Sequence, residues 1–408
     1  MESRFSSDFF AGNRQRLRQL FTGTAPIVMS ANGLLQRGGD STYAFSQDAN
    51  FWYLTGIDDP DIVLVIDRDN EYLIVPGRSA VREAFDGNVD TEALSNRSGI
   101  KQVYDDKEGW ERLGGRLKKV KHVATLSPPP AYVEHFGLYT NPARAVLVEK
   151  LLSFREGLEL LDISPHLIRM RMVKQLEELA AMKSAISITE AAIKEATRPA
   201  KLGKYAYEYE LEAEISRGFR RRGSTDAFEP IVASGERACT LHNVANDGRL
   251  ASGELIIIDV GAEVEHYAAD ISRTVSLGQP SRRQQAVHQA VQDVQNFALG
   301  LLKPGVSMKD YEQKIENFMG EKLRELGLIK LIDHESVRRF YPHATSHFLG
   351  LNVHDIGDYE RPLEPGMVLT VEPGIYIKEE AVGVRIEDDV LITKTGCKVL
   401  SAKLPKNL

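Results

Sequence analysis

The feature of this sequence that most constrains its fold is a pair of apolar, strand-like segments that each lead into an acidic residue. The strand formers at 255–258 run directly into Asp259, and ten residues separate that acid from Asp270. This spacing predicts a hairpin that returns the second acid beside the first. A second predicted hairpin has the same plan, with Glu372 on its first strand and Glu387 on its second. The sequence therefore predicts four acids among aliphatic neighbours.

Carboxylates clustered at the ends of apolar strands would repel one another, and each would incur a desolvation cost of several kcal/mol. Bound metal ions are the simplest compensation. A histidine-rich segment contains three of the ten histidines, His343, His347 and His354, and so supplies a neutral ligand. The spacing of His343 and His347 is that of a helical zinc site, but Ala344 stands where that motif needs glutamate. Four carboxylates and one imidazole are hard ligands, which favour two Mn²⁺-like ions over a thiolate zinc site.

Length and charge exclude several classes of protein. The 408 residues exceed the usual size of one domain, so two domains are expected. Lys and Arg total 51 against 58 Asp and Glu, a net charge of −7, which argues against a nucleic-acid partner. The apolar runs are strand-sized, so no membrane span or membrane partner is predicted. Two cysteines, Cys239 and Cys397, form no disulfide framework, and a cytoplasmic location is expected.

The predicted elements give the overall class α+β, with a mixed α/β domain first. In that domain, apolar runs between turn residues predict strands at 27–29, 51–54, 62–66, 72–75 and 122–126, and helical spacing covers 108–119 and 143–160. Beyond it, helices at 207–222, 282–302 and 308–326 alternate with hairpins around 254–277 and 366–394.

The boundary between the two domains is predicted from a change in composition. A segment rich in Glu, Ala, Lys and Ile, 172–196, is interpreted as one long connecting helix that Pro199 ends. Pro165 is interpreted as the end of the preceding element. The predicted domains are therefore 1–168 and 169–408.

The acids and histidines stand in short sequence motifs that resemble those of a known family. Asp259, Asp270, His347, Glu372 and Glu387 have the order and local contexts of the five metal ligands in the metallopeptidase family of aminopeptidase P, prolidase, creatinase and methionine aminopeptidase. That resemblance implies a C-terminal pita-bread catalytic domain.

Upstream, the segment 45–56 resembles the N-terminal domain that precedes the catalytic domain in aminopeptidase P and prolidase. The resemblance implies a creatinase N-terminal-like domain with a role in oligomerisation and substrate access. The resemblance thus spans nearly the whole chain, whose length counts against methionine aminopeptidase.

The resemblance also implies a role for each metal ligand. Asp259 would chelate one divalent ion and His347 the second, and Asp270 and Glu387 would bridge them. Glu372 would accept the proton of the attacking water and deliver it to the leaving proline nitrogen. The two ions, Mn²⁺ or else Zn²⁺ or Co²⁺, would activate that water and polarise the scissile carbonyl.

Further catalytic and substrate-binding residues are implied around these ligands. His354 would hydrogen-bond the developing oxyanion, His343 would line the proline pocket and His242 would position the substrate. Arg385 stands two residues from Glu387, so in a strand both side chains face the same way. It would pair with the ligand carboxylates, Asp259 among them, alongside Tyr376. Asp40 matches a position from which a neighbouring subunit approaches the substrate amine in aminopeptidase P, which implies a homodimer or homotetramer.

These residues predict a dinuclear exopeptidase that releases the N-terminal residue from peptides with proline second. The closest rival function is that of a prolidase, which requires a free carboxylate after the proline. A catalytically silent pita-bread module is a second rival, although it would have no need of two metals. A creatinase-like amidinohydrolase is a third, although it would not retain this ligand set.

Overall fold

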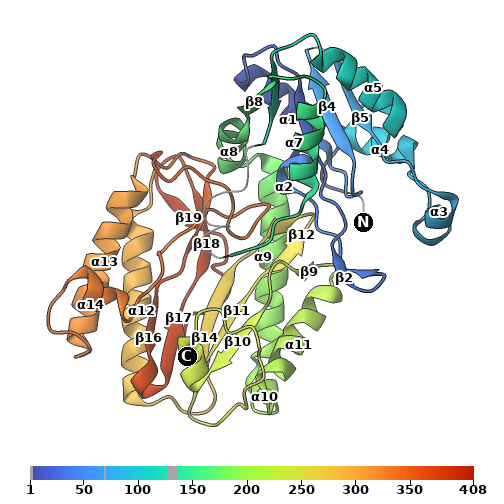
Figure 1. The fold of residues 1–408 in the computed structure, drawn as a ribbon. Coiled ribbons are helices and arrows are strands. Elements are labelled where there is room, and N and C mark those ends of the chain that lie inside the picture. Colours follow the sequence, from blue (N-terminus) through green and yellow to red (C-terminus); the bar gives the residue numbers. More distant parts are fainter. Residues whose placement is uncertain (1–2, 69, 127–136) are drawn as a thin grey trace. The chain divides into compact units, whose positions relative to one another are not determined.

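The structure is a computed structural model that describes residues 3–68, 70–126 and 137–408. The chain forms two compact units, Met1–Met170 and Arg171–Leu408 (Figure 1). The observed division therefore lies two residues beyond the end of the predicted first domain.

The first unit is built on a six-stranded sheet in the order β6-β5-β4-β1-β7-β8. Its strands are β1 (Ile27–Ser30), β4 (Val63–Asp67), β5 (Asn70–Ile74), β6 (Gln102–Tyr104), β7 (His122–Thr125) and β8 (Glu159–Asp162). The pairs β1–β4 and β4–β5 are antiparallel, whereas β5–β6, β1–β7 and β7–β8 are parallel. A small hairpin pairs β2 (Gln36–Gly38) with β3 (Ser41–Thr42).

Seven helices among the described residues accompany this sheet. They are α1 (Ser7–Leu20), α2 (Ala49–Thr55), α3 (Ala80–Asp86), α4 (Thr91–Ser98), α5 (Asp106–Leu117), α7 (Ala143–Ser153) and α8 (Ser164–Met172). Valines, leucines and aromatic side chains of the sheet, α5 and α7 form one buried cluster. The mixed α/β class predicted for this part of the chain is confirmed.

The strand predicted at 51–54 is wrong, because these residues lie in α2. The Asp48 side chain accepts hydrogen bonds from the backbone N–H groups of Asn50 and Phe51 and so caps the helix. Gly56 ends it in the left-handed conformation, at φ 69°. All four side chains of the run are buried, and an apolar run without alternation does not distinguish a buried helix from a buried strand.

Two predicted helices have different bounds in the structure. The segment 143–160 contains α7 only to Ser153, and β8 begins at Glu159 after Gly157 at φ 72°. The connecting helix predicted at 172–196 begins later, as α9 (Leu176–Ala196), where Gln175 and Glu178 form a capping box. The prediction that Pro165 ends an element is wrong, because Pro165 lies in the first turn of α8. Backbone N–H groups in a first turn have no partner within the helix, so the missing N–H of proline costs no hydrogen bond there.

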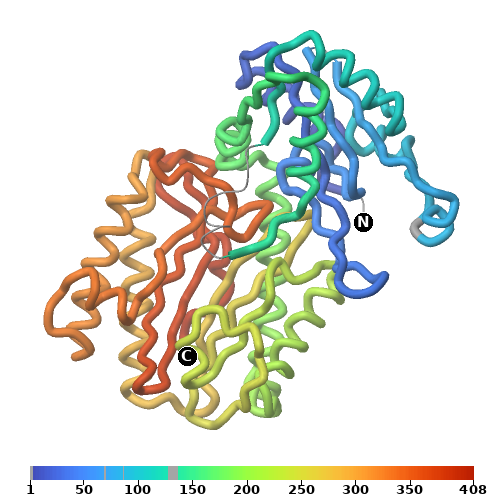
Figure 2. Tube along the Cα trace, in the orientation of Figure 1, coloured from blue at the N-terminus to red at the C-terminus, as the bar shows by residue number. Residues whose placement is uncertain are grey.

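The second unit surrounds its strands with two groups of helices (Figure 1). α9 and α11 (Glu208–Arg220) pack together and against the first group of strands, whereas α12 (Arg282–Leu301) packs on α13 (Met308–Glu325) and on the last strands. Two short helices, α10 (Pro199–Leu202) and α14 (His334–Arg338), complete the set. Figure 2 follows this path from α9, in green, to the C-terminal strands, in red.

The strands of the second unit form two long antiparallel hairpins that match the predicted ones. The first hairpin contains β11 (Leu255–Val260), β12 (Ala262–Val264), β13 (Tyr267–Ala268) and β14 (Ile271–Ser276), with β9 (Thr225–Asp226) and β10 (Ile231–Ser234) beside it. The second contains β15 (Val368–Val371), β16 (Gly374–Ile377), β17 (Val382–Arg385) and β18 (Asp388–Ile392), with β19 (Cys397–Val399) at its edge.

Each hairpin is interrupted at the same stage, and the acids lie at the interruptions. In the first, β11–β14 pairing ends at Val260 and Ile271, and β12–β13 pairing follows beyond Gly261. A Cβ atom at Gly261 would lie 1.8 Å from the Ala269 carbonyl oxygen, so only glycine fits this break. In the second, β15–β18 pairing gives way to β16–β17 pairing around Glu372 and Glu387. Asp270, Glu372 and Glu387 therefore lie outside the regular ladders, whereas Asp259 stays in the β11–β14 ladder opposite Ser272.

No helix among the described residues combines the length and the apolar character that crossing a bilayer requires.

Candidate metal centre

The five predicted metal ligands border one cavity of about 750 Å³ in the second unit. His242, His343, His354 and Arg385, predicted as catalytic or substrate-binding residues, border the same cavity. Its remaining walls include apolar side chains, namely Phe228, Ile231, Leu241, Val244 and Val353, with Tyr359 among them. The structure thus brings together nine residues that the sequence spreads from 242 to 387.

The ligand side chains approach one another closely. Asp270, His347 and Glu387 each offer a ligand atom, and these atoms lie within 4.8 Å of one another. The Nε2 atom of His347 is 3.4 Å from Asp270 Oδ2 and 3.4 Å from Glu372 Oε1. Asp259 lies opposite Ser272 in the β11–β14 ladder. Ser272 is two residues beyond Asp270, so the hairpin brings Asp259 and Asp270 close together. One small volume therefore receives four carboxylates and an imidazole.

Two carboxylate oxygens in this group lack a hydrogen-bond partner although they are buried. They are Asp259 Oδ1 and Glu387 Oε1, on side chains whose residues are only 8% and 1% exposed. A buried acceptor without a partner is costly, and more so when it is charged. Both oxygens belong to predicted metal ligands, and hard oxygen donors suit divalent cations. The donor set therefore fits divalent metal ions.

Burial, and after it the charges of neighbouring acids, raises the pKa values of three of the predicted ligands. Burial, then the charges of Asp259, Asp389 and Glu372, raise the pKa of Asp270 well above its usual range. Burial and the neighbouring carboxylates do the same for the pKa of Glu387. Burial raises the pKa of Glu372 to about 7 against the opposing effects of His347 and Arg385. Added positive charge is what would return these groups to the ionised state.

Arg385 supplies one positive charge and holds three neighbours. Its guanidinium donates to Asp259 Oδ2 at 2.5 Å, to the Tyr376 hydroxyl at 2.9 Å and to Ser272 Oγ at 3.0 Å. The predicted pairing with Asp259 alongside Tyr376 is confirmed. Because Asp259 Oδ2 is engaged by Arg385, its second oxygen, Oδ1, remains for a cation.

Two of the histidines that border the cavity are held as neutral rings. His343 donates through Nδ1 to the Ala344 carbonyl at 2.9 Å, which leaves Nε2 to accept from the Tyr376 hydroxyl at 2.9 Å. Burial and the Arg385 charge lower the pKa of His343 to about 3. The ring of His354 lies 4.2 Å from that of His347, and burial together with the nearby imidazoles lowers the pKa of His354 to about 4.

Asp40, the remaining predicted site residue, belongs to the first unit. It lies in the exposed turn between β2 and β3, next to Gly39 at φ 53°. Its role at the site of a neighbouring subunit stays a prediction.

Two residues that support the ligands were not predicted from the sequence. Ser272 donates to Glu387 Oε2 at 2.7 Å while it accepts from Arg385. Asp389 accepts from the backbone N–H of Asp270 at 3.2 Å. The signal for Ser272 was its position two residues after Asp270 in the returning strand, where it lies opposite Asp259. Asp389 gave no comparable signal, because its partner is more than a hundred positions away.

Comparisons with known proteins agree with this geometry. Residues 180–394 match the model of metallopeptidase family M24, and residues 10–124 match the aminopeptidase P N-terminal domain. The Xaa-Pro aminopeptidase of Haemophilus influenzae is 34% identical, over 98% of this chain and 95% of that protein.

Two solved structures illustrate the likeness in fold. Zinc-substituted E. coli aminopeptidase P in complex with product superposes with a TM-score of 0.88 at 30% identity, covering 99% of this chain and 97% of that one. Proline aminopeptidase P II from Yersinia pestis gives 0.86 at 32% identity, covering 99% and 98%. The two-domain architecture, the pita-bread arrangement and the clustered donors lead to one conclusion: the chain belongs to metallopeptidase family M24.

Proposed function

We propose that this protein is a metal-dependent exopeptidase that hydrolyses the bond between an N-terminal residue and a following proline. The observation that carries the proposal is the convergence of five donor side chains, two of them with unpartnered buried oxygens, on one cavity. Full-length similarity to proteins named Xaa-Pro aminopeptidase supports the substrate class.

The catalytic roles follow from the surroundings of each residue. Bound divalent ions would supply an activated water and polarise the scissile carbonyl. Glu372, with one oxygen 3.4 Å from His347 Nε2, is placed to take up a proton from that water and release it to the leaving nitrogen. Asp259, Asp270, His347 and Glu387 would hold the ions together with Glu372.

Neutral imidazoles suit the remaining steps. His354, whose pKa is lowered to about 4, would donate a hydrogen bond to the oxyanion without bringing a full charge. His343 would line the proline subsite, where its Nδ1 and Nε2 atoms are already engaged. His242 would position the substrate, and Arg385 would keep Asp259 oriented. A proline nitrogen carries no N–H, so recognition would depend on such side walls rather than on a bond to the scissile amide.

The metal, the assembly and the location are further parts of the proposal. Carboxylate-rich donors favour Mn²⁺, with Zn²⁺ or Co²⁺ as substitutes. A homodimer or homotetramer would let Asp40 approach the substrate amine in a neighbouring subunit, and the exposure of its turn is compatible with this. Both cysteines, Cys239 and Cys397, are free thiols, which supports a reducing, cytoplasmic environment.

The rival functions lack support in this site. A catalytically silent binding module would not need buried carboxylate oxygens without partners, which this site has. A creatinase-like amidinohydrolase would not retain all five metal ligands, whereas this chain has all five. The prolidase function is disfavoured because the similar proteins and solved structures are named aminopeptidases.

A peptide panel separates the aminopeptidase from the prolidase. With Mn²⁺, we expect Xaa-Pro-Yaa tripeptides and longer peptides to lose their first residue with kcat/KM at least about tenfold above that for Xaa-Pro dipeptides. This difference corresponds to about 1.4 kcal/mol of transition-state binding. Matched Xaa-Ala-Yaa peptides serve as the control and should resist cleavage. A preference for the dipeptide would identify a prolidase instead.

A further inference from the structure

Helix α13 holds the segment that carries two of the site histidines. The segment runs from His343 to His347, and the consecutive helix residues Tyr311 and Glu312 contact it. The Tyr311 hydroxyl lies 3.0 Å from Ser346 Oγ. The Glu312 carboxylate accepts from Thr345 twice, from the backbone N–H at 3.0 Å and from Oγ1 at 2.9 Å.

Thr345 in turn connects Glu312 to the predicted catalytic acid. Its side chain is fully buried, and its carbonyl accepts from the backbone N–H of Glu372 at 2.9 Å. Its hydroxyl donates to Glu312 and therefore accepts from the Tyr341 hydroxyl at 2.6 Å. One residue thus joins a carboxylate on α13 to the backbone of Glu372 and lies two positions from His347.

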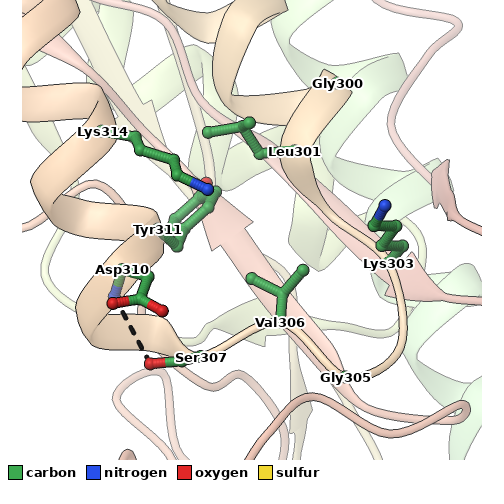
Figure 3. Close-up of a pocket in the computed structure, with 9 residues that line it drawn as sticks. All are labelled: Gly300, Leu301, Lys303, Gly305, Val306, Ser307, Asp310, Tyr311 and Lys314. Atoms are coloured by element: carbon green, nitrogen blue, oxygen red, sulfur yellow. Dashed lines mark hydrogen bonds between the residues drawn. The ribbon is translucent and has the colours of Figure 1, made fainter.

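The same helix reaches the segment at a third point. One turn beyond Glu312, Glu316 accepts from Arg338 at 2.6 Å, and Arg338 donates to the His343 carbonyl at 2.6 Å. Figure 3 shows the Tyr311 ring among the residues that line a pocket of about 310 Å³ at the turn between α12 and α13. Tyr311 and Ser346 are both buried, so the contact between their hydroxyl groups is shielded from solvent.

We propose that Glu312 is a positioning residue for the metal centre, which acts through Thr345 on His347 and Glu372 together. The inference rests on the proposed function. Partners that orient metal ligands commonly affect metal affinity or activity by about 10–100-fold when removed. Loss of the Glu312 carboxylate would leave the Thr345 N–H buried without its acceptor and would remove one of the two partners of the Thr345 hydroxyl, and the segment would be free to shift.

The test measures Mn²⁺ affinity on metal-depleted full-length protein, and kcat and KM after reloading. For Glu312→Ala we expect the affinity to fall about 10–100-fold, and kcat at saturating Mn²⁺ to fall at least about fivefold with KM within about threefold. Glu312→Gln keeps an oxygen that accepts from the Thr345 N–H, so it should recover most of the affinity. Glu321→Ala, on the exposed face of the same helix, is the control and should bind Mn²⁺ like wild type.

The outcomes separate this inference from the proposed function. Wild-type protein that neither binds Mn²⁺ nor cleaves peptides would contradict both. Normal wild-type behaviour with a Glu312→Ala affinity within about twofold of it would overturn the inference alone, even if the melting temperature fell. Should Glu312→Ala fail to fold, Thr345→Val removes the hydroxyl contacts with Glu312 and Tyr341 and keeps the backbone N–H contact with Glu312. It must weaken Mn²⁺ binding at least about threefold, and Tyr341→Phe must not, for the inference to stand.

Discussion

Glu372→Gln is expected to lower kcat for an Xaa-Pro-Yaa peptide by about 10³-fold while the protein stays folded. Glutamine matches the size of glutamate but cannot take up and release a proton, and general acid–base catalysis contributes about 10²–10⁴-fold in enzymes. Steady-state kinetics with saturating Mn²⁺ measures the change.

Metal content must be measured on the same Glu372→Gln sample, because Glu372 is also a predicted ligand. If the variant binds two ions and has no activity, the loss of activity is due to proton transfer. If the variant has lost an ion, the loss of activity is due to metal ligation. The matched control is Glu379→Gln, at an exposed acid two residues beyond the end of β16, whose ion pair with Arg339 is also exposed. Its kcat should stay within about twofold of wild type. A Glu372→Gln enzyme that keeps more than about a tenth of the wild-type kcat would contradict the assigned role.

Asp270→Asn is expected to abolish activity and yet to stabilise the metal-free protein at pH 8. Burial and three neighbouring acids raise the pKa of Asp270 in the folded state. A carboxyl group with a raised folded pKa binds more protons when folded than when unfolded, so its contribution to stability is greatest at low pH and is lost as the pH rises through the folded pKa. Asparagine stays neutral and removes this loss.

Denaturant unfolding of the chelator-treated proteins checks this prediction. At pH 8 the free energy of unfolding of Asp270→Asn should exceed that of wild type by at least about 1.4 kcal/mol, the equivalent of one pKa unit. At a lower pH, closer to the ordinary pKa of an aspartate, the difference should shrink. Asp247→Asn, at an exposed position, should change neither value. Equal destabilisation of Asp270→Asn at both pH values would show that the acids do not repel one another as described.

Much of the site could be predicted because its residues sit in local patterns. The strand formers before Asp259 and Glu372 determine the hairpins, and the hairpins bring Asp270 and Glu387 back beside them. The prediction of a strand at 51–54 was wrong because all four side chains are buried and apolar. Such a run lacks the alternation of apolar and polar residues that distinguishes a strand from a helix. There the helix signals were the cap Asp48 and the stop Gly56.

The supporting contacts could not be predicted for a different physical reason. Glu312 and Thr345 are 33 positions apart, and Asp270 and Asp389 are 119 apart. Whether such side chains meet depends on how α13 and the hairpins pack, which no local periodicity records. Arg385 was found because it stands two positions from Glu387 in the same segment.

Anomalous diffraction from crystals grown with Mn²⁺ tests the central claim most directly. The account predicts two Mn²⁺ peaks per chain, about 3.5–4 Å apart, within coordination distance of Asp259, Asp270, His347, Glu372 and Glu387. Peaks elsewhere in the molecule, or a single peak that leaves Asp259 or His347 without a metal contact at saturating Mn²⁺, would contradict it.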